Sequence, residues 1–256
     1  MSRIEQTFEQ LREAGRKGLV GYLTAGDPDL AQSEADLREA LSSGLDVLEL
    51  GVPFSDPTAD GPTIQAAGQR ALAAGVTVSS VLALARKLRQ TYATPIILFG
   101  YLNPFLAYGY ERLCVEAAAA GVDGLLVVDL PFEESAELRQ HADRKGLDLI
   151  PLVAPTTDAV RAARILRGAR GFVYYIMVKG VTGARQEVAG DVAGHLARLR
   201  SATRLPIAAG FGVSTPEQAR TVAAAADAVV VGSALVQAAC DHRVGAFVRS
   251  LRGALG

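Results

Sequence analysis

Short apolar runs alternate with helical patterns along the whole chain. Eight runs are rich in Val, Ile, Leu, Tyr and Phe and contain few polar positions, as expected of strands that are buried on both faces. We predict strands at Gly18–Leu23, Asp46–Leu50, Pro95–Phe99, Gly124–Val128, Leu149–Val153, Phe172–Met177, Leu205–Ala209 and Ala228–Val231.

Amphipathic segments separate these runs, and one more precedes the first. We predict helices at Ser2–Ala14, Leu30–Ser43, Thr63–Ala74, Val78–Tyr92, Pro104–Ala120, Glu134–Lys145, Thr157–Arg167, Asp191–Ser201, Pro216–Ala225 and Val236–Leu251. Strands that alternate with helices indicate parallel βαβ units, and eight units close a (β/α)8 barrel. The prediction is therefore an α/β fold, a TIM barrel with an extra N-terminal helix. A doubly wound open sheet is the alternative, although it usually has fewer strands.

Composition narrows the class of protein. The chain of 256 residues is 50% hydrophobic, enough for a large core, and no linker interrupts it, so we expect one domain over residues 1–256. Its 26 basic and 27 acidic residues nearly cancel, which argues against nucleic acid or anionic membranes as partners. Cys114 and Cys240 have neither disulfide-framework nor metal-ligand spacing. The charged N-terminus lacks the apolar core of a signal peptide, so we expect a soluble, cytoplasmic protein.

The stretch ELGVPFSDPTADGP follows the second predicted strand and carries three carboxylates. In a barrel of this kind the active site lies at the carboxyl ends of the strands. Glu49 ends its strand there, where partial desolvation would favour the protonated form and suit acid–base chemistry. Asp56 and Asp60 lie in a loop that three prolines restrain. For both aspartates, a role in the turn dipeptides Asp-Pro and Asp-Gly is an alternative explanation.

Glycine-rich turns follow the last two strands. AGFG at 209–212 precedes a helix, and VGSA at 231–234 opens another. Backbone amides at such turns and helix N-termini bind anions, and these two loops form the usual phosphate site of such barrels. Glycines that serve only tight turns are the alternative. Carboxylates beside a phosphate site indicate proton transfer on a phosphorylated substrate.

Several aromatic and loop residues are further candidates. Tyr174 and Tyr175 are neighbours in a strand, so one faces the barrel interior and the other faces the helices. Tyr22, at the end of the first predicted strand, and Tyr101, just past the third, could line an apolar pocket, although core packing explains each equally well. Residues 178–190 form a long, glycine-containing segment that could act as a lid. The lysine nearest a strand end is the loop residue Lys179, which disfavours a Schiff-base aldolase.

The run Glu49–Gln65, ELGVPFSDPTADGPTIQ, resembles the signature of tryptophan synthase alpha subunits. The resemblance extends over essentially the whole chain, through YLTAGDP at 22–28, GVTGAR at 180–185, GFGVS at 210–214 and GSA at 232–234. It implies a lyase that cleaves indole-3-glycerol phosphate to indole and glyceraldehyde 3-phosphate by a retro-aldol reaction without a cofactor. It also implies an alpha2-beta2 heterotetramer, in which indole passes to a beta subunit that holds pyridoxal phosphate.

The same resemblance implies roles for individual residues. Glu49 would be the general acid–base, and Asp60 would stabilise the positive charge on the indole N–H. Spacing from Gly180 makes Tyr174 the inward tyrosine. Asp56 would pair with Thr182 when the site closes, and Asp129 would communicate with the partner. The positions that match the family's phosphate contacts are Gly183, Phe211, Gly212, Gly232 and Ser233. With Tyr22, Tyr101 and Thr182 they make up the predicted substrate site.

Two residues depart from the family pattern, and two other functions compete. Met177 stands where many family members have a small or polar residue, and Lys179 lies two residues further on. The sequence does not decide what these two residues do to the candidate lid. Another phosphate-binding barrel enzyme, such as indole-glycerol-phosphate synthase or an isomerase, is one alternative, but the synthase predicts a lysine at a strand end. A non-catalytic partner-activating subunit is the other, and it would be expected to lack Glu49 or Asp60. We place the beta contact on the loops after strands 2 and 3, with Pro53 and Asn103-Pro104.

Overall fold

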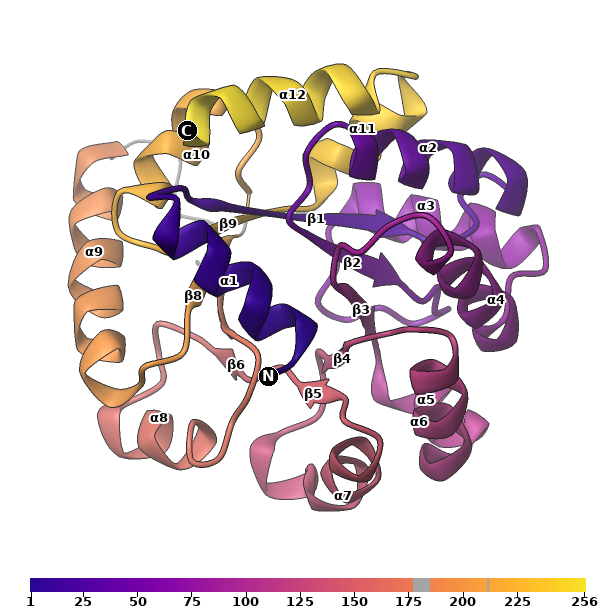
Figure 1. The fold of residues 1–256 in the computed structure, drawn as a ribbon, viewed down its shortest axis with the longest axis horizontal. Coiled ribbons are helices and arrows are strands. Elements are labelled where there is room, and N and C mark those ends of the chain that lie inside the picture. Colours follow the sequence, from indigo (N-terminus) through magenta and orange to yellow (C-terminus); the bar gives the residue numbers. More distant parts are fainter. Residues whose placement is uncertain (177–184, 211) are drawn as a thin grey trace.

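The computed structural model describes residues 1–176, 185–210 and 212–256, and only the backbone of residues 185–192. Its strands form one parallel sheet in the order β5-β4-β3-β2-β1-β9-β8-β7-β6 (Figure 1). The strands are β1 Gly18–Thr24, β2 Val47–Gly51, β3 Ile96–Gly100, β4 Gly124–Val127, β5 Asp148–Leu149, β6 Leu152–Val153, β7 Val173–Ile176, β8 Ile207–Gly210 and β9 Ala228–Val231.

The sheet closes on itself through β5 and β6. These two strands end the sheet on opposite sides, yet only Ile150 and Pro151 separate them in the chain. The Ile150 amide donates to the Leu125 carbonyl at 2.9 Å, and the Tyr174 amide donates to the Pro151 carbonyl at 2.9 Å. One interrupted strand therefore bridges β4 and β7, and the predicted eight-stranded barrel is confirmed.

Three helix predictions need correction: two predicted helices are broken, and the helix predicted over Asp191–Ser201 begins at Arg185, so residues 185–190 of the candidate lid are helical. Otherwise helices surround the barrel as predicted. They are α1 Arg3–Glu13, α2 Leu30–Ser42, α3 Pro62–Ala73, α4 Val78–Arg89, α5 Leu102–Tyr108, α6 Tyr110–Ala119, the 3-10 turn η1 Phe132–Glu134, α7 Ala136–Arg144, α8 Ala159–Ile165, α9 Arg185–Ala202, α10 Pro216–Ala223, α11 Ser233–Cys240 and α12 Val244–Leu255. The predicted helix Pro104–Ala120 breaks at Gly109, where φ is +88°, and Val236–Leu251 breaks near His242, where φ is +53°. A right-handed helix cannot continue through a positive φ.

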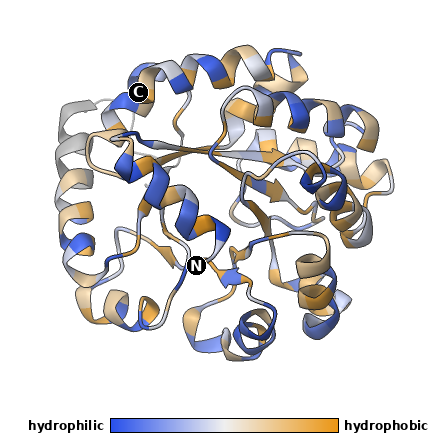
Figure 2. Ribbon diagram, viewed as in Figure 1, coloured by the Kyte–Doolittle hydropathy of each residue, from blue (hydrophilic) through white to orange (hydrophobic). Residues whose placement is uncertain are grey.

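Packing follows the pattern of strands covered on both faces. Residues that point inward, among them Val20, Val47 and Ile97, form one buried cluster, and outward residues pack beneath the helices. Figure 2 shows the apolar strands at the centre and polar residues on the outer helices. Among the described residues, no single helix is long and apolar enough to cross a membrane. Helices α3 and α4 taken together are long and apolar enough, by length and composition only, but the pair is bent by 101° at the break between them.

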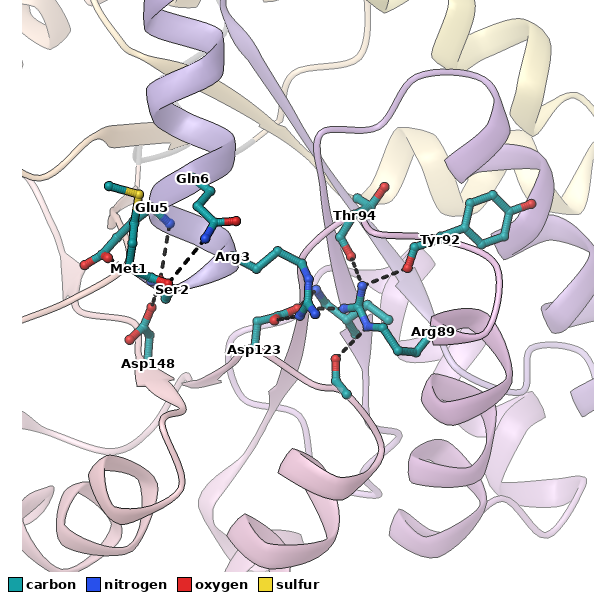
Figure 3. A network of polar contacts seen from close by, with 12 residues as sticks. Met1, Ser2, Arg3, Glu5, Gln6, Arg89, Tyr92, Thr94, Asp123 and Asp148 are labelled. Carbon is teal, nitrogen blue, oxygen red and sulfur yellow. Dashed lines mark hydrogen bonds and ion pairs between the residues drawn. The ribbon is translucent and has the colours of Figure 1, made fainter.

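Helix α1 covers the amino-terminal end of the barrel (Figure 1). Its buried Ile4, Phe8 and Leu11 join the inner cluster. Polar contacts fix its first turn, because the Ser2 hydroxyl donates to Asp148 at 2.8 Å and Arg3 pairs with Asp123 (Figure 3). With this end covered, the opposite end, where the strands finish, is left for a site.

Candidate active site

Glu49 was predicted to end its strand, but it is the third of the five residues of β2, beside Tyr22 of β1 in the strand register. Its residue is fully buried, and neither carboxyl oxygen has a hydrogen-bond partner among the described residues. Burial without a compensating partner disfavours the charged form and raises the pKa of Glu49 to about 8. At neutral pH this carboxyl group therefore carries its proton and can donate it.

Two buried tyrosines share the pocket with Glu49. Burial raises the pKa of Tyr22 and of Tyr174 well above the ordinary value, and the nearby charges of Asp60 and Glu49 raise both further. Tyr174 belongs to the inner cluster, whereas Tyr175 packs in the outer cluster beneath the helices. The structure thus places Tyr174 inward, on the side that the family spacing predicted.

Asp60 enters the pocket from the loop after β2. Burial raises its pKa, and a hydrogen bond from the Tyr101 hydroxyl opposes that shift by stabilising the carboxylate. The same hydroxyl accepts from the Ala59 amide at 3.0 Å, and the Tyr101 ring lies 5.4 Å from the ring of Phe54. Tyr101 therefore fixes the loop that carries Asp60.

Asp56 and Asp129 lie on the surface of the protein. Both are exposed. The Asp129 carboxylate accepts from the Leu102 amide at 2.7 Å, so it joins the loop after β4 to the start of α5. Thr182, Gly183 and Phe211, together with Met177 and Lys179, lie outside the described residues.

The two predicted anion-binding turns differ in what caps the helix that follows. Helix α10 is capped by Thr215, whose side chain accepts from the Gln218 amide. Helix α11 begins after Gly232 and has no side-chain cap, so its first amides remain available to an anion. A Cβ placed on Gly232 would lie 3.7 Å from Cβ of Tyr22, and one on Gly61 would lie 4.0 Å from Oγ of Ser233. The start of α11 therefore borders the pocket, while Gly212, at φ +82°, follows β8.

The sequence reasoning missed three residues that position Tyr22. The Tyr22 hydroxyl lies 3.3 Å from the Thr24 hydroxyl, and its ring meets the ring of Phe99 edge-on with centroids 5.0 Å apart. A Cβ on Gly51 would overlap the Tyr22 hydroxyl, so only glycine leaves room for that ring. Thr24 stands in the quoted run YLTAGDP, and alternation along β1 was the signal that could have found it.

Fold and site together define a class, a (β/α)8-barrel protein with a protonated carboxyl group buried among its strands. Comparison with known proteins gives the family. A family profile described as "Tryptophan synthase alpha chain" matches residues 8–246, and the chain belongs to this family. The family cleaves indole-3-glycerol phosphate to indole and glyceraldehyde 3-phosphate, so the predicted lyase function is confirmed.

Named relatives match over most or all of their length. The tryptophan synthase alpha chain of Geobacter sulfurreducens is 52% identical over 263 residues, covering 100% of both chains. That of Gluconacetobacter diazotrophicus is 54% identical over 237 residues, 92% of this chain and 86% of the relative. The crystal structure of the alpha chain from Legionella pneumophila superposes with a TM-score of 0.91 at 38% identity, covering 100% and 97%. A structure of tryptophan synthase from M. tuberculosis, in an aminoacrylate-bound form, gives 0.90 at 35% identity, covering 100% of both chains.

Proposed function

We propose that Glu49 shuttles the proton in the cleavage of indole-3-glycerol phosphate. The observation that carries this role is the buried, unpartnered carboxyl group with its pKa near 8. In its protonated form Glu49 donates to C3 of the indole ring. It then accepts the proton of the adjacent glycerol hydroxyl as the carbon–carbon bond breaks, which returns it to its starting state and releases indole and the aldehyde.

Asp60 stabilises the cation that forms on protonation of the ring. Charge develops on the indole N–H, and the hydrogen bond from Tyr101 favours a carboxylate at this position. The two carboxyl groups thus take different roles because their surroundings differ, one without a partner and the other with a donor. Tyr22 and Tyr174 form apolar walls for the ring.

The phosphate group of the substrate is held at the start of α11. The uncapped amides there, with Gly232 and Ser233, support this assignment. We include Gly212, and also Gly183 and Phe211, which lie outside the described residues. Thr182 and Asp56 are proposed to close the site. Binding the phosphate far from the reacting bond fixes the orientation of the ring.

We further propose that residues 1–256 form one domain that works in the cytoplasm, without a cofactor of its own and with no nucleic acid or membrane partner. Family membership implies a beta subunit as partner, and we expect an alpha2-beta2 heterotetramer with pyridoxal phosphate in the beta subunit. Pro53, which we placed in the contact, is buried. Asn103 and Leu106 of α5 are exposed, Leu106 by 54%, and with Asp56 and Asp129 they form the surface that we assign to the partner.

The test is release of glyceraldehyde 3-phosphate from indole-3-glycerol phosphate, with and without a beta subunit. Glu49→Gln removes the titrating proton and keeps the shape, so we expect kcat to fall by about 10² to 10⁴, with substrate binding retained. Glu39→Gln, on the outer helix α2, is the control and should leave kcat unchanged. Near-normal turnover by Glu49→Gln would exclude the proposed role.

A further inference from the structure

Helices α3 and α11 pack on each other, and both begin at the candidate active site (Figure 1). A Cβ on Gly61, the residue before α3, would lie 4.0 Å from Oγ of Ser233, the first residue of α11. A Cβ on Gly232 would lie 3.6 Å from Cδ1 of Ile64 in α3. Because Asp60 directly precedes Gly61, the start of α3 carries Asp60, and the start of α11 carries the proposed phosphate contacts.

The surface through which α3 packs on its neighbours consists of small residues. Its buried residues are Ala67, Gly68 and Ala71, and the helix packs on α11 and on β1. Such small side chains form shallow ridges, so they let the helix approach closely but do little to prevent it from sliding or tilting. The position of α3, and with it the position of Asp60, therefore depends on contacts of more defined geometry.

Arg70, in the last turn of α3, makes such a contact. Its Nε and Nη2 atoms donate to the two carboxylate oxygens of Asp27, in the loop after β1, at 2.7 and 2.8 Å. Nη2 also donates to Sγ of Cys240, the last residue of α11, at 3.3 Å. Two parallel hydrogen bonds between a guanidinium and a carboxylate fix direction as well as distance. The Asp27 side chain is 8% exposed, so solvent weakens this pair less than it weakens a pair on the open surface.

We propose that Arg70, through its two hydrogen bonds with Asp27, positions α3 against β1 and α11 and so sets the separation between Asp60 and the first amides of α11. The ring that Asp60 serves and the phosphate that α11 holds belong to one substrate molecule. That separation therefore decides whether both ends of the substrate fit at once. Arg70 acts through α3, so it is a positioning residue and not a catalytic one. This inference rests on the proposed function of the site.

The experiment compares how three ligands bind to the full chain, by calorimetry or by NMR titration. Indole-3-propanol phosphate has the ring and the phosphate of the substrate but lacks its hydroxyl groups, so it spans the site without being cleaved. Indole and glycerol 3-phosphate each carry one end alone. In Arg70→Gln we expect the Kd of the spanning analogue to rise about 10-fold, and the Kd of each fragment to stay within about twofold of the wild type. A purely structural role of Arg70 would not confine the loss to the ligand that spans both ends.

Further variants test the pair itself. Arg70→Lys keeps the charge but loses the fork, so its Kd for the analogue should lie between those of the wild type and Arg70→Gln. Asp27→Asn should raise this Kd as much as Arg70→Gln does, and the double variant should raise it no further, because both changes break the same pair. The matched control is Arg38→Gln, which breaks a pair with Glu34 inside α2 and should leave the Kd unchanged.

The outcomes distinguish this inference from the proposed function. Unchanged affinity of Arg70→Gln for the analogue, with or without a loss of stability in urea, would overturn the positioning role and leave the proposed function standing. Equal losses for the analogue and the two fragments, or additive losses in the double variant, would do the same. A wild-type protein that does not bind the analogue would overturn both.

Discussion

Two carboxyl groups, one just before strand β2 and one within it, have opposite surroundings. Asp46, just before the strand, accepts from the Leu19 amide at 2.7 Å and pairs with Arg252. Glu49, three positions later and inside the strand, has no hydrogen-bond partner among the described residues. The difference between the two groups is therefore in their hydrogen-bond and ion-pair partners and not in burial alone. Asp46 has such partners and stabilises the fold, whereas Glu49 has none among the described residues and is free to react.

The pattern at the amino-terminal end recurs around the barrel. Asp123, just before β4, accepts from the Ile96 amide at 2.8 Å and pairs with Arg3 and Arg89 (Figure 3). Asp227, just before β9, accepts from the Ile207 amide at 2.7 Å and pairs with Arg200. Each aspartate ties the start of one strand to its neighbour and receives a helix arginine. These contacts at the amino-terminal ends of the strands stabilise the fold, as expected for the end of the barrel opposite the proposed active site.

The largest effect should appear when Glu49 is replaced and stability is measured against pH. The folded state keeps the proton on Glu49 from its ordinary pKa of 4.5 up to about 8, whereas the unfolded state loses it. The contribution of this protonated group to the free energy of unfolding is fully present below pH 4.5 and is lost as the pH rises through 8. Glu49→Gln does not titrate, so it should gain stability over the wild type by up to about 5 kcal/mol above pH 8.

Urea unfolding at pH 5, 7 and 8.5 measures this gain. The difference between variant and wild type should grow with pH, while activity is lost at every pH. A difference that is constant with pH would mean that Glu49 is ionised in the folded protein, and the comparison between the two carboxyl groups would fail.

The next effect lies at the opposite end. Asp123→Ala leaves the Arg89 guanidinium and the Ile96 amide without their carboxylate, so we expect a loss of about 3–5 kcal/mol in the free energy of unfolding. The active face is untouched, so kcat should stay within about twofold. Asp143→Ala, which removes an exposed carboxylate, should cost less than about 1 kcal/mol. Lost turnover in a folded Asp123→Ala would show that the two ends are coupled.

Sequence reasoning reached the barrel and Glu49 because both depend on local patterns. Apolar runs of strand length predict the eight strands, and Glu49 is the one carboxyl group inside the second of these runs, two positions before the end of β2. The breaks at Gly109 and His242 were missed because apolar residues continue on both sides and only the backbone angle interrupts the helix. The Tyr101–Asp60 contact joins distant positions, which no local pattern relates. In the sequence Asp123 lies between a predicted helix and a predicted strand, which indicates a loop residue, but contacts from distant parts of the chain bury it.

A smaller effect is expected from Tyr101→Phe. The ring still packs on Phe54, but Asp60 loses the hydroxyl that stabilises its carboxylate. One charge-assisted hydrogen bond is worth about 1.5–3 kcal/mol, so kcat/KM should fall by roughly 10- to 100-fold. Tyr92→Phe, which removes a hydroxyl on the outer surface, should leave kcat/KM unchanged. Steady-state kinetics decides, and unchanged kcat/KM in Tyr101→Phe would remove Tyr101 from the support of Asp60.

The smallest effect concerns the contact between the hydroxyls of Tyr22 and Thr24. Both hydroxyls are buried and lie 3.3 Å apart, at the rim of the pocket that holds Glu49. Tyr22→Phe and Thr24→Val should each lower kcat/KM by about 0.5–1.5 kcal/mol of transition-state stabilisation, because each leaves one hydroxyl without its partner. The double variant should lose little more than either single one, since the remaining unpaired hydroxyl is then gone. A double-mutant cycle measures this coupling, and strictly additive losses would show that the two hydroxyls act independently.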